Sequence, residues 1–170
     1  MDATDARVLI DYIYWMRDRI LESVERLPAH EFLSAKAVTT RDLRATLVHE
    51  LDVEWSWRER LLDGEFPDTE DLNPDDYMTL SVLRAHWRSD EEKMRAWAES
   101  LTDDALAVKP PNEKSPQALW YYVMHLVAHA MQQFSDAATL LSLTGHSPGE
   151  LGFLEFADTR HSSDIEAVGE

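Results

Sequence analysis

Four amphipathic stretches, separated by nearly all of the glycines and prolines, constrain most strongly what this chain can fold into. Apolar residues recur at three- and four-residue spacing within residues 5–27, 39–62, 79–101 and 116–143. This spacing is the period of an α-helix with one buried face. Five glycines and seven prolines fall almost entirely between the stretches, and alternating β-branched runs are scarce. The pattern therefore predicts an all-α fold, a four-helix bundle.

Start and stop signals give the expected limits of these helices. The second helix is predicted to open near residues 39–40, and the fourth near Ser115, with Pro116 at its first helical position. The fourth helix is predicted to stop at Gly145. The segment 65–78 is acidic, contains prolines and is long for a loop. It predicts a long crossover connection between the second and third helices of the bundle.

The length of 170 residues fits one domain with a substantial core. We assign residues 1–157 to the bundle, with residues 151–156 as a short apolar return onto it. Residues 158–170 are expected to form a mobile C-terminal tail.

Charge and composition exclude several functions. The net charge of −17, from 16 basic and 33 acidic residues, repels phosphate backbones and anionic lipids, so neither nucleic acid nor membrane is an expected partner. The absence of cysteine excludes disulfides, a catalytic cysteine and cysteine-ligated zinc. No 18-residue apolar run and no secretory signal pattern is present, so a cytoplasmic location is expected.

The histidines are the candidate functional residues. His125 and His129 lie one turn apart in the apolar stretch 119–143, and His129 and Gln133 occupy consecutive turns of its core stripe. His49 lies in the earlier helical stretch. Buried imidazoles need partners, and histidines from several helices of a bundle can converge on a transition metal. Two alternatives remain open at this point: core histidines satisfied by hydrogen bonds, and a solvent-facing His49.

Three segments together resemble the DinB/YfiT superfamily, over about residues 5–156. They read RDLRATLVHELDVEWSW (41–57), LWYYVMHLVAHAMQQFSDAA (119–138) and GHSPGELGFL (145–154). The resemblance implies a divalent metal, nickel or zinc, held by His49, His129 and the residue at position 133. Here that residue is Gln133, where the family most often has histidine, and an amide is a weaker ligand than imidazole. His125 is the alternative third ligand.

The resemblance also implies an activity. It predicts a thiol-dependent S-transferase in detoxification or stress response, in which a low-molecular-weight thiol, activated on the metal, attacks a small electrophile without a covalent enzyme intermediate. The alternatives are a non-catalytic metal or small-molecule binding protein and a metal-dependent hydrolase assisted by Asp136 or Glu50. A homodimer is expected, although no sequence feature identifies its interface.

Overall fold

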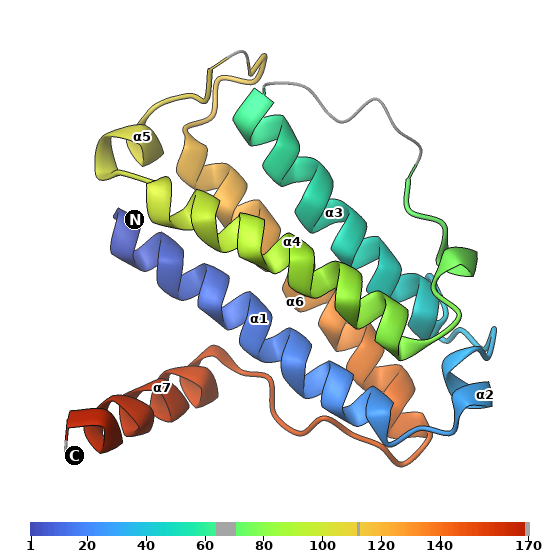
Figure 1. Ribbon diagram of the computed structural model, residues 1–170. Coiled ribbons are helices and arrows are strands. Elements are labelled where there is room, and N and C mark those ends of the chain that lie inside the picture. Colours follow the sequence, from blue (N-terminus) through green and yellow to red (C-terminus); the bar gives the residue numbers. More distant parts are fainter. Residues whose placement is uncertain (64–70, 112, 169–170) are drawn as a thin grey trace.

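The computed structural model describes residues 1–63, 71–111 and 113–168, without the side chains of residue 63 and residues 162–168. Within these ranges the chain forms seven α-helices, one short 3₁₀ helix and no strand (Figure 1). The all-α class predicted from the sequence is therefore confirmed. The elements are α1 (Ala3–Glu25), α2 (Ala29–Phe32), α3 (Leu43–Asp63), η1 (Pro74–Asp76), α4 (Leu80–Ser100), α5 (Asp103–Ala107), α6 (Leu119–Leu143) and α7 (Phe153–Val168).

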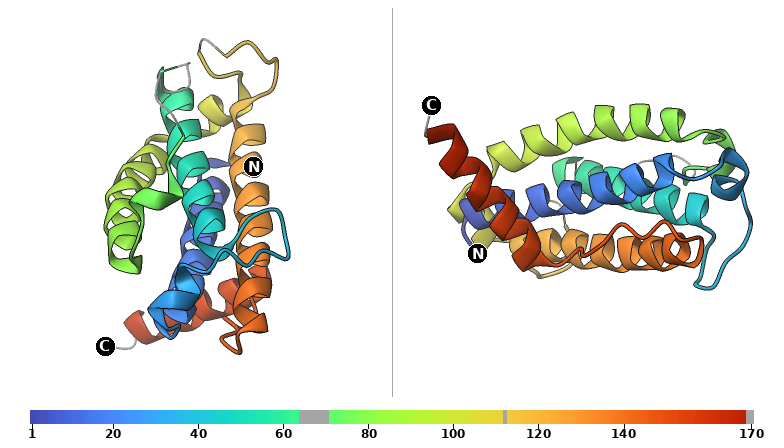
Figure 2. Two further views of the ribbon diagram at one scale, coloured as in Figure 1. Left: turned by 90° about the vertical axis from the view of Figure 1, so that its right-hand side faces the viewer. Right: turned by 90° about the horizontal axis from the view of Figure 1, so that it is seen from below.

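Four long helices, α1, α3, α4 and α6, pack around a common core. α1 contacts α4 and α6, and α3 contacts the same two helices from the other side. α3 and α4 run in one direction, and α1 and α6 run in the opposite direction (Figures 1 and 2). No described helix combines the length and the apolar character needed to cross a membrane.

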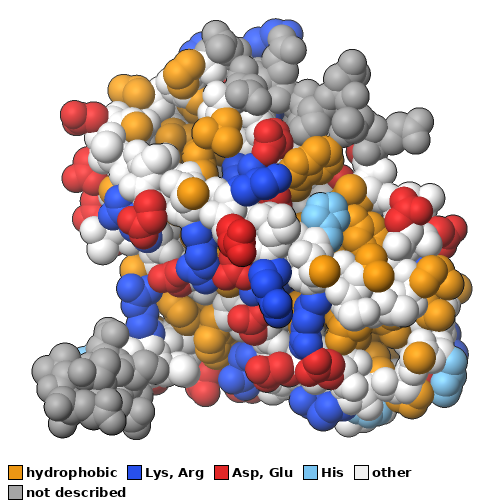
Figure 3. Space-filling model, viewed as in Figure 1, with side chains coloured by type: hydrophobic (Ala, Val, Ile, Leu, Met, Phe, Trp, Pro, Cys, Tyr) orange, Lys and Arg blue, Asp and Glu red, His pale blue; other side chains and the backbone are white. Residues whose placement is uncertain are grey.

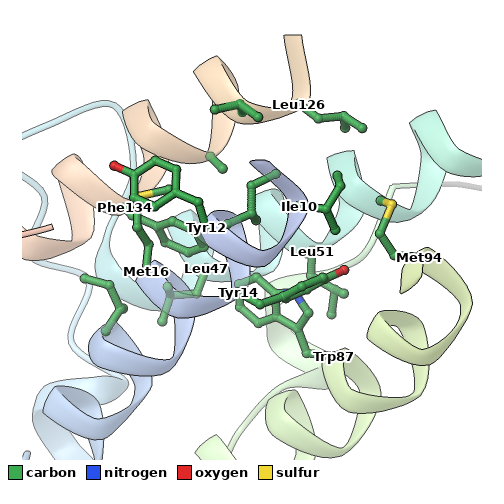
Figure 4. Close-up of a cluster of buried hydrophobic side chains, with 14 of the residues drawn as sticks. Ile10, Tyr12, Tyr14, Met16, Leu47, Leu51, Trp87, Met94, Leu126 and Phe134 are labelled. Carbon is green, nitrogen blue, oxygen red and sulfur yellow. The ribbon is translucent and has the colours of Figure 1, made fainter. Parts of the chain in front are cut away.

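Large apolar side chains fill the core between these helices. Tyr14 of α1, Leu51 of α3 and Trp87 of α4 meet in one cluster, and Phe134 of α6 stacks on Trp87 (Figure 4). Fully burying one such side chain stabilises the fold by about 1.5–3 kcal/mol. Because α3 packs against both α4 and α6, residues on two of its faces are removed from water.

Two helices begin later than the sequence signals indicate. Ser115 was predicted to cap the fourth long helix, but α6 begins at Leu119, and Ala118 provides no side-chain cap. In the segment before α6, the Glu113 carboxylate accepts the Ser115 N–H (3.0 Å) and binds Arg60 through two hydrogen bonds of 2.8 Å each. The Leu119 N–H donates to the Val108 carbonyl (2.8 Å) at the start of the helix. The start of α3 is fixed in a similar way, because the Asp42 carboxylate accepts the N–H of residue 45 (2.8 Å).

The connection between α3 and α4 runs from residue 64 to residue 79. The predicted crossover falls partly on residues 64–70, which lie outside the described residues. In its described part, the Asp52 carboxylate accepts the N–H of Leu72 (3.0 Å), so this part of the connection returns to α3.

The segment after α6 folds back onto α1, as the apolar pattern of residues 151–156 indicates. Phe156 is buried, with its ring 5.5 Å from Tyr12 and 5.9 Å from Trp15. The Tyr12 hydroxyl donates to the carbonyl of Leu151 (2.6 Å). α7 continues across the predicted boundary after residue 157, and the mobility of residues 158–170 stays a prediction.

Candidate metal centre

His49 of α3 and His129 of α6 face each other across the interface of the two helices. Their Nε2 atoms are 3.3 Å apart, and their rings lie at 66° with centroids 5.1 Å apart. Both residues are half-buried. The structure thus brings together two of the candidate residues that are 80 positions apart in the sequence, and the alternative of a solvent-facing His49 is wrong.

Glu50 fixes the orientation of the His129 ring. Its carboxyl lies 2.6 Å from His129 Nδ1 and is 1% exposed, whereas the His129 side chain is 15% exposed. When Nδ1 carries the proton and donates it to this carboxylate, Nε2 bears the lone pair and faces His49. In the hydrolase alternative Glu50 is a possible base, but its carboxyl contacts the Nδ1 side of the His129 ring, away from His49.

The electrostatic environment keeps the imidazoles neutral. Burial lowers the pKa of His129 and of His49 below the ordinary value, and the positive charge of Arg41 lowers both further. Burial also raises the pKa of Glu50 well above its usual range, and Glu50 accepts the Nδ1 proton of His129 in a charge-assisted hydrogen bond only in its ionised form. At neutral pH both imidazoles therefore have a nitrogen lone pair available, which is the form that binds a metal.

The two candidates for a third ligand occupy different environments. Gln133 is buried, one turn beyond His129 on α6. His125 is exposed, with its ring 4.9 Å from Trp57 and 6.2 Å from His129. Gln133 therefore lies on the core side of the pair and His125 on the solvent side.

The spacing of the histidine pair fits a metal ion. Two nitrogens bound to one tetrahedral zinc at about 2.0–2.1 Å are about 3.3–3.4 Å apart, which matches the observed separation of 3.3 Å between the Nε2 atoms. Among the described residues, no group of three or more His, Cys, Asp or Glu side chains could hold a metal ion. A third ligand from these described residues would therefore be of another type, such as the Gln133 amide.

The sequence matches a known protein family. A sequence model of the DinB family matches residues 1–166. No curated protein matches the chain.

Proposed function

Because the chain belongs to the DinB family, we propose that it is a metal-binding protein of this type. In this proposal His49 and His129 hold a divalent transition metal, nickel or zinc, and Gln133 is the third protein ligand. The observation that carries the proposal is the 3.3 Å separation of two neutral imidazole nitrogens in a half-buried interface. Family membership also favours a DinB-type four-helix bundle with a long crossover connection, made here by the segment between α3 and α4.

Glu50 supports the ligand set without contacting the metal. Histidine ligands commonly donate their second N–H to a carboxylate, which fixes the tautomer and makes the ligand nitrogen more basic. The contact of 2.6 Å between Glu50 and His129 Nδ1 has this arrangement. The same contact argues against the hydrolase alternative with Glu50 as base, because this buried carboxyl already binds His129.

For activity, we propose thiol-dependent S-transfer to a small electrophile, in detoxification or stress response. A divalent metal supplies Lewis acidity, which lowers the pKa of a thiol that reaches it toward neutrality. The chain contains no cysteine, so the reacting sulfur must come from a small molecule. The exposure of His125 beside His129 leaves a solvent side from which such a molecule can approach the pair. The expected homodimer stays a prediction.

The test is metal content and metal affinity. We expect protein purified without chelator or affinity metal to carry nickel or zinc, and the metal-free protein to bind cobalt(II) with a visible d–d spectrum. His49→Ala and His129→Ala should each weaken cobalt binding by more than about a hundredfold. His30→Ala is the matched control, because the His30 side chain is 79% exposed on α2. Unchanged metal stoichiometry in His49→Ala would remove the proposal.

A non-catalytic binding protein is the second candidate, and the amide at position 133 favours it. A weakened ligand is tolerable where turnover is not required. Gln133→His should raise metal affinity in either case. In an enzyme tuned to its present ligands the same change should also lower the rate of thiol conjugation, whereas a binding protein has no such rate to lose.

A further inference from the structure

The solvent-facing side of α6 carries almost no charge. Within α6, Asp136 is the one Asp, Glu, Lys or Arg residue, whereas α1, α3 and α4 contain eight such residues each. On the face formed by α1 and α4, basic and acidic side chains lie next to one another (Figure 3), as in the pair Arg95–Asp11. A helix at the surface of a globular protein ordinarily presents charged residues to water. The exposed side of α6 departs from this rule in a chain whose net charge is −17.

Six uncharged residues on this side of α6 follow one another at alternating spacings of three and four residues. We call them the α6 stripe: Tyr121, Met124, Ala128, Met131, Ser135 and Ala138. Ala138 is half-buried and the other five are exposed, among them the three large side chains. The spacing is that of a seam along which two helices pair. Because the described part of the chain leaves these side chains exposed, a helix that pairs with them would belong to another molecule.

The large and small residues of the α6 stripe complement one another in one register. Two copies of α6 that run antiparallel are related by a twofold axis, and an axis between residues 129 and 130 aligns all six positions. Each large side chain then lies opposite a small one of the other copy: Tyr121 opposite Ala138, Met124 opposite Ser135, and Met131 opposite Ala128. A parallel pair would instead place every residue opposite its own copy, with large side chains against large ones.

A hollow beside the α6 stripe lies where this register places the large side chains of a second copy. It measures about 340 Å³, and Met131, Ser135 and Ala138 are among the residues that line it. Tyr12 of α1 and Phe153 at the start of α7 also line it. Because the register sets the second copy's tyrosine and first methionine over the two small residues of this hollow, they can enter it as knobs enter holes.

We propose that the α6 stripe is the interface of a homodimer, in which two copies of this chain pair antiparallel about a twofold axis between residues 129 and 130. Two copies with a net charge of −17 each repel one another, and the uncharged stripe is where they can approach with the least repulsion. Phe153 and its neighbour Leu154 are also exposed and extend the apolar surface beside the hollow. The inference does not depend on a metal at the histidine pair.

The first experiment measures the mass of the full-length chain and its variants by sedimentation equilibrium. Wild type should have twice the chain mass of 19.6 kDa. Met131→Glu places two carboxylates near each other at the twofold axis, so the dissociation constant of the dimer should rise by more than about a hundredfold. Val82→Glu on α4 is the matched control, because Val82 is 47% exposed and Met131 is 48% exposed, and it should leave the dimer intact.

A mixing experiment separates loss of the interface from loss of the fold. Met131→Lys alone should also be monomeric, because two ammonium groups then meet at the axis. An equal mixture of Met131→Glu and Met131→Lys should form a dimer again, because opposite charges face each other there. A variant that had lost its fold would not recover its partner on mixing.

A second experiment tests the antiparallel register by oxidation of engineered cysteines, since the natural chain contains none. Met124→Cys/Ser135→Cys should oxidise to a covalent dimer, because the two positions face each other across the axis. Within one chain they are about 16 Å apart along α6, too far for a disulfide. Met124→Cys alone should not cross-link in the proposed register, whereas a parallel pair would cross-link it.

The outcomes decide the inference without reference to metal binding. A monomeric wild type at near-millimolar concentration would overturn it, and the stripe would then be free for a different partner. Equal dimerisation of Met131→Glu and Val82→Glu would place the dimer interface elsewhere on the molecule. Cross-linking of Met124→Cys alone would overturn the antiparallel register.

Discussion

The two interfaces of α3 use buried polar side chains in opposite ways. Toward α4, Arg58 pairs with Asp90, and each side chain is 2% exposed. In the same interface, the Trp87 indole donates to Glu54 (3.2 Å). Toward α6, His49 and His129 are half-buried, and their nearest nitrogens face each other at 3.3 Å.

The polar groups between α3 and α4 hold the two helices together. Those between α3 and α6 are available to bind a ligand. The cation of Arg58 is matched by an anion inside the protein, the Asp90 carboxylate. The two imidazoles are kept neutral by burial and by a nearby cation, so each has a lone pair to offer. Stability should therefore depend mainly on the α4 side of α3, and metal binding on the α6 side.

Arg58→Met should have the largest effect on stability. It leaves the Asp90 carboxylate buried without its cation, which costs about 3–5 kcal/mol of unfolding free energy in comparable pairs. Urea denaturation measures this loss, and cobalt binding of the folded variant should be unchanged. The double variant Arg58→Met/Asp90→Leu should recover most of the stability, because neither charge then remains buried. A loss of less than about 1 kcal/mol in the single variant would contradict the structural role.

Glu50→Gln should have an intermediate effect, on metal affinity instead of stability. Without a carboxylate at His129 Nδ1, cobalt affinity should fall by about 10–100-fold. Unfolding free energy at neutral pH should stay the same or rise, because a buried acid is replaced by a neutral amide. Glu54→Gln, one turn further along α3, is the matched control for metal binding. An equal loss of cobalt affinity in both variants would mean that Glu50 has no special role.

Glu54→Gln should have the smallest effect, visible as a change in how the unfolding free energy depends on pH. Burial raises the pKa of Glu54 well above its usual range, and the charge of Glu50 raises it further. The stability from the protonated carboxyl is therefore fully present below the unfolded-state pKa of about 4.3 and is lost as pH rises toward the raised value. Between pH 5 and pH 8 the unfolding free energy of Glu54→Gln should decline less than that of wild type. Parallel profiles from urea denaturation would show that Glu54 titrates normally.

The helical periodicity was sufficient to predict the long helices, whereas the meeting of His49 with His129 was implied by the family resemblance and left open by periodicity. The core stripe of α6 contains Leu126, Gln133 and Ala137, all buried as the spacing indicates. Periodicity predicts the burial of these residues because burial of a helix depends on which residues share one face.

Contacts between elements account for what the sequence did not predict. Ser115 has the character of a helix cap, but α6 begins at Leu119, whose N–H donates to the Val108 carbonyl in the segment before it. A signal for Glu50 and Glu54 was present, since both follow Leu47 at helical spacing within a buried stripe, but acidic residues in such a stripe are normally assigned to the surface.

The contact between Arg60 and Glu113 has a consequence for the His49 and His129 pair, which lies several helical turns away. It ties the last turns of α3 to the segment that leads into α6, and its strength holds the pKa of Glu113 at about 2. Along α3 it lies about 16 Å from His49, and a slide of one residue between two helices displaces their side chains by about 1.5 Å. This contact therefore helps to fix the axial alignment of α3 and α6, and with it the 3.3 Å approach of the His49 and His129 nitrogens.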